Sequence, residues 1–136
     1  MLPLVVLLAL AGYLHLQDPA VDSGNVAGTG SVVEAFAAQR SGVWLETGGE
    51  VARVLSDDNE GSRHQRFILE LGGGHSVLVA HNIDLAGRVP LARGDVVRLR
   101  GRYEWNKRGG VIHWTHHDPD GRVPGGWVQL ETDIYR

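Results

Sequence analysis

From residue 43 onward, the chain is a succession of short segments rich in valine, isoleucine and aromatic residues, each bounded by turn residues. Segments of this kind are typical of β-strands. We expect strands at 43–55, 64–71, 75–82, 95–105 and 111–116, and a sixth strand, with a weaker pattern, at 127–131. The first is long enough to need a kink, for which Gly48-Gly49 provides a place. The sequence therefore predicts a mainly β fold.

The connections between these strands narrow the choice of fold. Gly72-Gly73-Gly74 predicts a tight hairpin between the second and third strands, and 106–110 predicts another between the fourth and fifth. Residues 83–94 hold Pro90 and show no alternation, so they form a loop or a helical turn. Three strands, a connection and two further strands give the order of the five-stranded OB-fold barrel. A small β-sandwich or roll with the same strand count is the alternative.

The chain before residue 43 has a different character. Residues 1–17 contain no Asp, Glu, Lys or Arg and are mostly apolar, as in a signal peptide or an N-terminal anchor. About 14 apolar residues at ~1.5 Å each fall short of the ~30 Å hydrocarbon core of a membrane. Residues 18–30 have the composition of a linker, and the capping-box spacing of Ser31 and Glu34 predicts a short helix at 31–42.

This organisation predicts a single OB-like barrel domain at 43–136, preceded by the short helix and the apolar export segment. We expect the protein to be exported, and so periplasmic or extracellular, or else tethered to the membrane by an uncleaved N-terminal segment. The chain has no cysteine, which excludes a disulfide partner, thiol chemistry and a lipid-bearing N-terminal cysteine.

Composition and motifs restrict the function. The formal net charge of −3 offers no global attraction for nucleic acid or anionic lipid, so a basic binding surface has to be local. The sequence lacks Gly-x-Ser-x-Gly, His-Glu-x-x-His and phosphate-binding glycine loops. No catalytic residue can be assigned from these patterns, and they favour a non-enzymatic role.

Two blocks of the sequence are distinctive: His-Asn-Ile-Asp-Leu-Ala at 81–86 and Gly-Gly-Val-Ile-His-Trp-Thr-His at 109–116. Together with the segments 64–68, 94–97 and 103–106 and with Gly126-Trp127, they resemble a bacterial family of small exported proteins known only as a domain of unknown function. The resemblance extends over residues 43–135. It implies a shared OB-like fold and an exported location, but no activity, substrate or catalytic residue.

The fourth expected strand places a row of arginines on one face. Alternation turns Arg98, Arg100 and Arg102 to the side opposite Val97 and Leu99. Successive members lie about 6.6 Å apart, close to the spacing of phosphates along an extended single strand. The candidate ligand-binding residues are this row, the basic turn after it and nearby aromatic positions: Arg98, Arg100, Arg102, Trp105, Lys107, Arg108, His113 and Trp114. The alternatives are a solvated outer strand face and tryptophans that belong to the core.

The histidines suggest a zinc site. Within one strand, His113 and His117 would lie about 13 Å apart and His116 would point to the opposite side, so no such pair could hold one ion. An OB-type barrel, however, brings the third strand beside the fifth. The candidate metal ligands therefore come from both strands and their ends: His81, Asp84, His113, His116 and Asp118. The alternative is that these histidines hydrogen-bond to the backbone or stack at a polar face.

Three functions remain open. The leading hypothesis is a non-catalytic binding module for an oligomeric or anionic ligand, such as single-stranded nucleic acid or an oligosaccharide, on the second and third strands and the loops 56–63 and 106–110. The second is a metal-dependent hydrolase or nuclease that uses the His/Asp cluster. The third is a structural or partner-binding envelope protein, in which the polar cluster stabilises the barrel.

Overall fold

The computed structural model describes residues 24–136, with side chains from Ser31 onward. The expected export segment at 1–17 and the first part of the expected linker lie outside the described residues. The described elements are α1 Gly24–Ala37, β1 Val43–Val54, β2 His64–Glu70, β3 Ser76–Asn82, β4 Val96–Glu104, β5 Val111–His113, β6 Trp127–Leu130 and β7 Asp133–Tyr135. In this part of the chain, no helix has the length and apolar character needed to cross a membrane.

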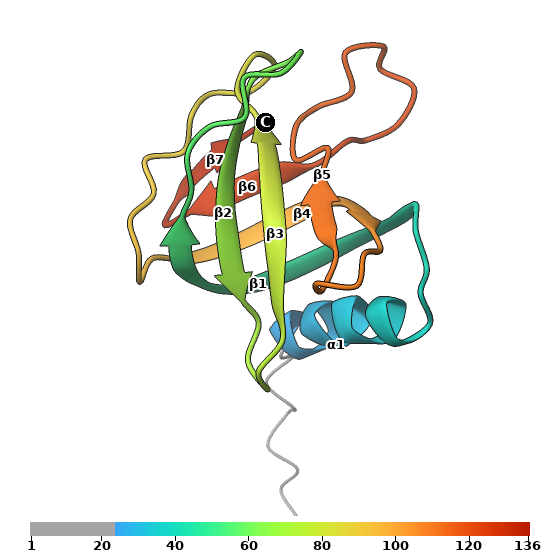
Figure 1. The fold of residues 1–136 in the computed structure, drawn as a ribbon. Helices are drawn as coiled ribbons and strands as arrows, with labels where there is room; N and C mark the ends of the chain where they lie inside the picture. Colours follow the sequence, from blue (N-terminus) through green and yellow to red (C-terminus); the bar gives the residue numbers. More distant parts are fainter. Residues whose placement is uncertain (1–23) are drawn as a thin grey trace, which may run out of the picture.

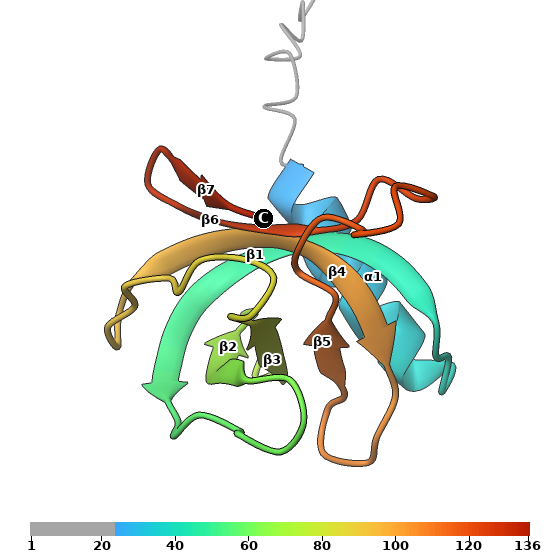
Figure 2. The ribbon, with the colours of Figure 1, turned by 90° about the horizontal axis from the view of Figure 1, so that it is seen from above.

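Five strands close into a barrel. The hydrogen-bonded order is β1-β2-β3-β5-β4, and β4 pairs back with β1, residues 96–103 against 43–50. Neighbouring strands are antiparallel except β3 and β5, which run parallel at Leu78 and Val111. Figure 1 shows β2, β3 and β5 side by side across one face, and Figure 2 shows β1 and β4 curving around the other side. This is the OB-fold order, so the expected barrel is confirmed.

β1 belongs to both halves of the barrel. Its residues 43–50 pair with β4, and from Glu50 to Val54 it pairs with β2. The register shifts between Val51 and Arg53, so the irregularity lies there and not at Gly48-Gly49, where we expected it. The second of these glycines permits a close approach instead, because a Cβ on Gly49 would lie 2.1 Å from the carbonyl oxygen of Glu70.

The helix α1 covers one end of the barrel, beside the β2–β3 hairpin and the β4–β5 turn (Figure 1). Val32 and Ala35 are buried in the barrel core, which explains why the helix docks there. It ends in a Schellman motif: Gln39 has a φ of 52° and its N–H donates to Phe36, while the N–H of Arg40 donates to Ala35.

These helix bounds differ from the expected 31–42. The helix begins at Gly24, inside the segment that we expected to be a linker, and it ends before Gly42. Residues 24–30 include three glycines, which are weak helix formers, so the sequence pattern gave no helical signal there. Ser31 consequently lies inside the helix and not at its N-cap.

Alternation along the strands fills the barrel. Large side chains from all five strands meet inside it and are fully buried: Val51, Phe67, Leu69, Val79, Leu99, Tyr103 and Ile112. The Tyr103 hydroxyl donates to the carbonyl of Gly109 at 3.0 Å, so its polar end is satisfied. A Cβ on Gly110, which has a φ of 91°, would lie 2.3 Å from that hydroxyl. The ring of Tyr103 therefore requires glycine at this position of the β4–β5 turn.

After β4, the chain forms more and shorter strands than the sequence predicts. β5 ends at His113 and not at His116, because Trp114 takes a φ of 59° and turns the chain out of the sheet. β6 pairs with β4 along residues 97–100, and β7, which we did not expect, pairs with β6. This hairpin lies outside β4, on the side away from β2, β3 and β5 (Figure 2).

Candidate ligand-binding face

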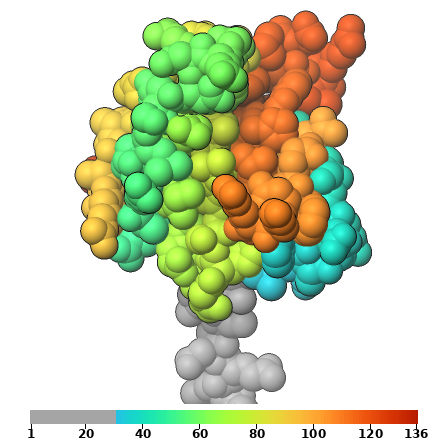
Figure 3. Space-filling view, viewed as in Figure 1, coloured from blue at the N-terminus to red at the C-terminus, as the bar shows by residue number. Residues whose placement is uncertain are grey.

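The outward-facing side chains of β2, β3 and β5 form one continuous face, on which polar and apolar residues are mixed. Alternation leaves Arg66, Ile68, Leu78, Ala80 and His113 half-buried on it, while the residues between them point into the barrel. Arg66 lies opposite Ala80, and Ile68 lies opposite Leu78. Figure 3 presents this side of the molecule, with β3 in yellow-green next to β5 and the β4–β5 turn in orange. We call it the β2–β3–β5 face, and it carries a pocket towards each end.

The first pocket lies between β2, the start of β3 and the β4–β5 turn, and its volume is about 320 Å³. Its walls combine the apolar side chains of Ile68 and Leu78 with Asn106, Arg66 and Arg108. The Nε of Arg66 donates to the carbonyl of Ser56 at 2.9 Å, which orients the guanidinium. Neither arginine makes an ion pair with any residue that the structure describes. This arginine pocket therefore offers two positive charges to a ligand.

The second pocket lies where β3 and β5 end, under the β5–β6 loop, and its volume is about 280 Å³. Its polar wall consists of three histidines, an amide and two carboxylates: His64, Asn82, His113, His116, Asp118 and Asp120. Leu85, Trp114 and Pro119 supply the apolar wall. We call it the histidine pocket.

Each imidazole of the histidine pocket has one nitrogen held by an oxygen acceptor. The Nδ1 of His64 lies 2.8 Å from the carbonyl of Ser62, and the Nδ1 of His116 lies 2.6 Å from that of His117. The Nε2 of His113 lies 3.4 Å from a carboxylate oxygen of Glu104. A carbonyl or carboxylate oxygen only accepts, so these nitrogens carry the proton. While the rings are neutral, the other nitrogen of each is a hydrogen-bond acceptor.

His81 has a structural position behind this pocket. It is fully buried, its Nδ1 accepts from the Thr115 hydroxyl at 2.7 Å, and its Nε2 donates to the carbonyl of Gly87 at 2.9 Å. Burial lowers the pKa of His81, so the ring stays neutral. The imidazole thus ties the end of β3 to the 83–95 connection and to the chain after β5.

Three further side chains hold the same connection. The Gln65 amide makes both hydrogen bonds to the backbone of Val89, and Asn82 accepts from the N–H groups of Asp84 and Leu85. Asp84 in turn accepts from the N–H and Nε of Arg63 at 2.8 and 2.9 Å. The distinctive block 81–86 therefore fixes the loops at one end of the barrel.

The β5–β6 loop is closed at its base by two glycines. The N–H of Gly126 donates to the carbonyl of His116 at 2.7 Å. A Cβ on Gly126 would lie 2.2 Å from the carbonyl of Arg100, and one on Gly125 would lie 2.6 Å from that of His116. The Nε of Arg100 also donates to the Gly125 carbonyl at 3.0 Å. These contacts hold the base of the β5–β6 loop, which forms one wall of the histidine pocket, in a fixed position against β4.

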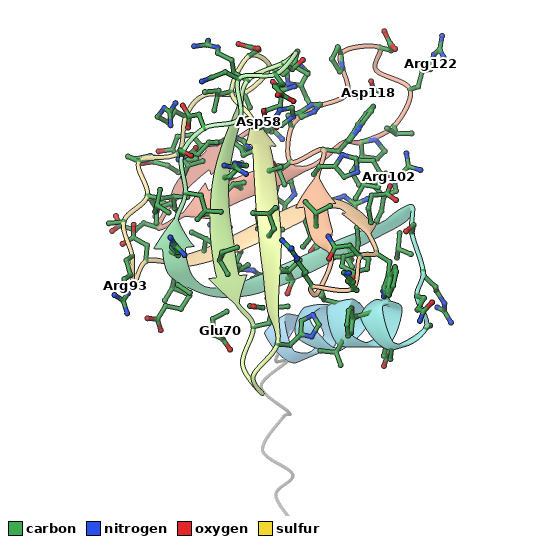
Figure 4. The ribbon with its side chains drawn as sticks, in the orientation of Figure 1. Asp58, Glu70, Arg93, Arg102, Asp118 and Arg122 are labelled. Atoms are coloured by element: carbon green, nitrogen blue, oxygen red, sulfur yellow. The ribbon has the colours of Figure 1, made fainter. Side chains whose placement is uncertain are left out.

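The arginine row of β4 faces outward as expected, but only Arg102, which pairs with His113 of β5, borders the β2–β3–β5 face. Arg100 lies 3.9 Å from Glu46 of β1 and 5.3 Å from the centre of the Trp44 ring. Arg102 lies 3.5 Å from Glu104, at the right of Figure 4. Arg98 is exposed and has no ion pair with a described residue. Two charges of the row are thus offset by carboxylates, which favours its reading as a solvated strand face.

The remaining ligand-binding candidates divide between core and surface. Trp105 packs on Phe36 of α1, with ring centres 6.4 Å apart, and its indole Nε1 is buried without a partner. Lys107 is exposed on the β4–β5 turn, next to Arg108 of the arginine pocket. Trp114 stacks on His116 at 5.4 Å and meets the Trp44 ring edge-on at 6.1 Å. Of the expected set, Arg108, His113 and Trp114 line pockets.

The structure separates the five metal candidates. His113, His116 and Asp118 line the histidine pocket together, whereas His81 and Asp84 have their polar atoms engaged elsewhere. Asp118 accepts from the backbone N–H groups of Asp120, Arg122 and Val123 in the β5–β6 loop (Figure 4), and these bonds, that of Asp120 foremost, lower its pKa. Among the described residues, no group of three or more His, Asp or Glu is arranged to hold a metal ion.

Sequence reasoning missed several residues of the two pockets: His64, Arg66, Ile68, Leu78, Asn82 and Asn106. The alternation of β2 and β3 contains the signal for four of them, because it separates His64, Arg66, Ile68 and Leu78 from the buried positions between. Which neighbours they acquire depends on the parallel contact of β3 with β5.

Fold and surface together define a small OB-like barrel domain whose open β2–β3–β5 face carries two pockets. The family model described as "Protein of unknown function (DUF3465)" matches residues 16–136, and the chain belongs to this family. The expected membership of a family of unknown function is thereby confirmed. No protein with curated annotation is detectably similar to the sequence.

Proposed function

We propose that this protein is a non-catalytic binding module that takes an extended, anionic oligomer along the β2–β3–β5 face. The observation that carries the proposal is the arginine pocket, where Arg66 and Arg108 approach one apolar surface without carboxylate partners among the described residues. Arg63, Arg88, Arg100 and Arg102 are paired with acidic side chains, and Arg93 and Arg98, which have no such pair among the described residues, line neither pocket. Unpaired guanidinium groups next to apolar surface suit an anionic ligand.

The dimensions of the face support an extended ligand. The arginine pocket includes Ser76 at the start of β3, and the histidine pocket includes Asn82 at its end. Six residue steps of ~3.3 Å make about 20 Å, enough for several units of an extended polymer. OB-type barrels commonly bind oligonucleotides and oligosaccharides on the corresponding strands. The apolar segment at 1–17 supports a location outside the cytoplasm as part of the same proposal.

Equilibrium titration of the full-length protein with labelled oligothymidylate, oligogalacturonate and oligoaspartate tests the proposal at low and at about 0.15 M ionic strength. We expect at least one of these polyanions to bind, more tightly at low salt. The double variant Arg66→Gln, Arg108→Gln should weaken binding about tenfold or more, since two charge-assisted contacts are lost. The matched control is Arg93→Gln, an exposed arginine in the connection between β3 and β4, at the left of Figure 4 and outside both pockets. Absence of binding at low salt, or equal loss in the control, would contradict the proposal.

A further inference from the structure

We propose that the histidine pocket receives a hydroxyl-bearing sugar ring, so that the extended ligand is an acidic oligosaccharide. This inference rests on the proposed function, because it assigns the acidic group of a neighbouring sugar to the arginine pocket. The free hydrogen-bonding groups of the histidine pocket, the charges around it, its apolar wall and its size support this assignment.

The free groups on the three histidines are acceptors. His64, His113 and His116 each donate through one ring nitrogen to Ser62, Glu104 and His117. The other ring nitrogen of each histidine has no hydrogen bond to a described residue. None of these nitrogens is a buried atom without a partner, so each is accessible to solvent. A phosphate, sulfate or carboxylate would bring only further lone pairs to these nitrogens. Hydroxyl groups bring donors, and sugars carry them around a ring.

The carboxylates near the pocket are already engaged. Asp118 accepts from three backbone N–H groups, and Glu104 lies between Arg102 at 3.5 Å and His113 at 3.4 Å. Only Asp120, which is exposed, remains without a partner for its carboxylate among the described residues. Hydrogen bonds from neutral backbone N–H groups leave the negative charge of Asp118 in place, so the acidic group of the ligand does not belong in this pocket. An uncharged, hydroxyl-bearing ring fits here, and the oligolysine probe below tests a cationic ligand instead.

The histidine pocket has an apolar wall against which a sugar ring can pack. Trp114, Leu85 and Pro119 form it, and Trp114 holds a φ of 59° that few aromatic residues adopt. This backbone conformation ends β5 and lets the indole take part in the wall beside His116. The volume of 280 Å³ lies just below the ~300–1,000 Å³ of pockets for drug-sized ligands, as expected for a single ring.

The distribution of charge along the face separates an acidic oligosaccharide from a nucleic acid. A nucleic acid carries a phosphate at every unit and binds best to a groove that is basic along its length. Here the unpaired arginines lie at one end of the face, and the pocket at the other end is lined by three histidines and by no arginine or lysine. A ligand with an acidic group on one unit and hydroxyl groups on the next matches this pattern.

Titration of the isotope-labelled full-length protein, followed by NMR, tests the inference with four probes: oligogalacturonate, a neutral malto-oligosaccharide, oligothymidylate and oligolysine. We expect oligogalacturonate to bind most tightly and to shift the ring signals of His113 and His116 and the indole signal of Trp114. The variant His113→Phe should weaken this binding at least about fivefold, because one acceptor is lost. His117→Phe is the control, since the ring of His117 is exposed and outside the pocket.

The outcomes separate the two proposals. Oligogalacturonate binding that shifts only the signals around Arg66 and Arg108 overturns the sugar assignment and leaves the proposed function standing. Tighter binding of oligothymidylate or oligolysine, with shifts at Trp114, also overturns it. If no polyanion binds, both proposals fail. Thermal unfolding of each variant shows whether a weaker affinity reflects the lost contact or a disrupted fold.

Discussion

The hydroxyl of Thr115 donates a 2.7 Å hydrogen bond to the fully buried ring of His81, across 34 positions of sequence. This bond joins the two most distinctive blocks of the chain, 81–86 and 109–116. Since the second ring nitrogen of His81 is bonded to Gly87, the imidazole is saturated. His81 is therefore a structural residue of the barrel end and is not available to a ligand.

Replacing the donor of this bond should destabilise the barrel. In Thr115→Val the side chain keeps its shape, but the Nδ1 of His81 is left buried without a partner, which costs about 1–3 kcal/mol. Chemical denaturation measures the free energy of unfolding. Thr132→Val, at an exposed position, is the control and should stay within ~0.5 kcal/mol of the wild type. An unchanged stability for Thr115→Val would show that the bond does not matter.

Stability should also depend on pH through the same ring. Burial lowers the pKa of His81 in the folded state, so the unfolded chain binds a proton first as the pH falls through about 6.5. The free energy of unfolding should therefore decrease from about pH 7.5 to pH 5.5, by up to ~1.4 kcal/mol per pH unit for one such group. His113, whose pKa burial also lowers, adds to the same slope. The slope should diminish in His81→Gln and persist in His117→Gln.

A methyl group at the base of the β5–β6 loop should be poorly tolerated. Gly126→Ala would bring a Cβ to 2.2 Å from the Arg100 carbonyl and 2.3 Å from that of Trp114. Shifts of the backbone at this crowded point should cost about 1–3 kcal/mol in thermal or chemical unfolding. Gly87→Ala, whose Cβ would lie 3.8 Å from its nearest neighbour, is the matched control. Equal stability of the two variants would show that the loop base is not rigid.

The arginines of β4 should contribute little to ligand binding. Arg100 and Arg102 are offset by Glu46 and Glu104, and they lie outside the two pockets. We expect Arg98→Gln and Arg102→Gln to change the affinity for the best-bound polyanion by less than about twofold, as for other surface charges. Arg100 is kept as arginine in this test, because its Nε also holds Gly125 at the base of the β5–β6 loop. A loss of affinity as large as that of the Arg66→Gln, Arg108→Gln variant would instead show that the binding site lies on β4.

Much of the fold could be predicted from local patterns, because strand alternation and paired glycines act over a few residues. Such patterns predicted the places of β1 to β6 and of both hairpins, and they predicted that Arg98, Arg100 and Arg102 point outward. The partners of these arginines could not be predicted, since Glu46 faces Arg100 only in the register of β1 with β4. β7 was missed because three residues are too few to show alternation.

The site was harder to predict than the fold. A histidine's role depends on what its two nitrogens meet, and for His81 these partners lie 6 and 34 positions away. The expected neighbourhood of the third and fifth strands grouped His81 with His113 and His116, but only the latter two line the histidine pocket, because both ring nitrogens of His81 are bonded elsewhere. The histidine pocket itself arises only once Trp114 turns the chain out of β5.

The double pairing of β1 has a consequence for biosynthesis. β2 and β3 can form a meander with the second half of β1 as soon as they leave the ribosome, but residues 43–50 must wait for β4, roughly fifty residues later. Until then, that half-strand exposes unsatisfied backbone groups to any other extended chain nearby. Residues 43–50 are therefore the part of β1 with which a second extended chain can pair until β4 has been synthesised.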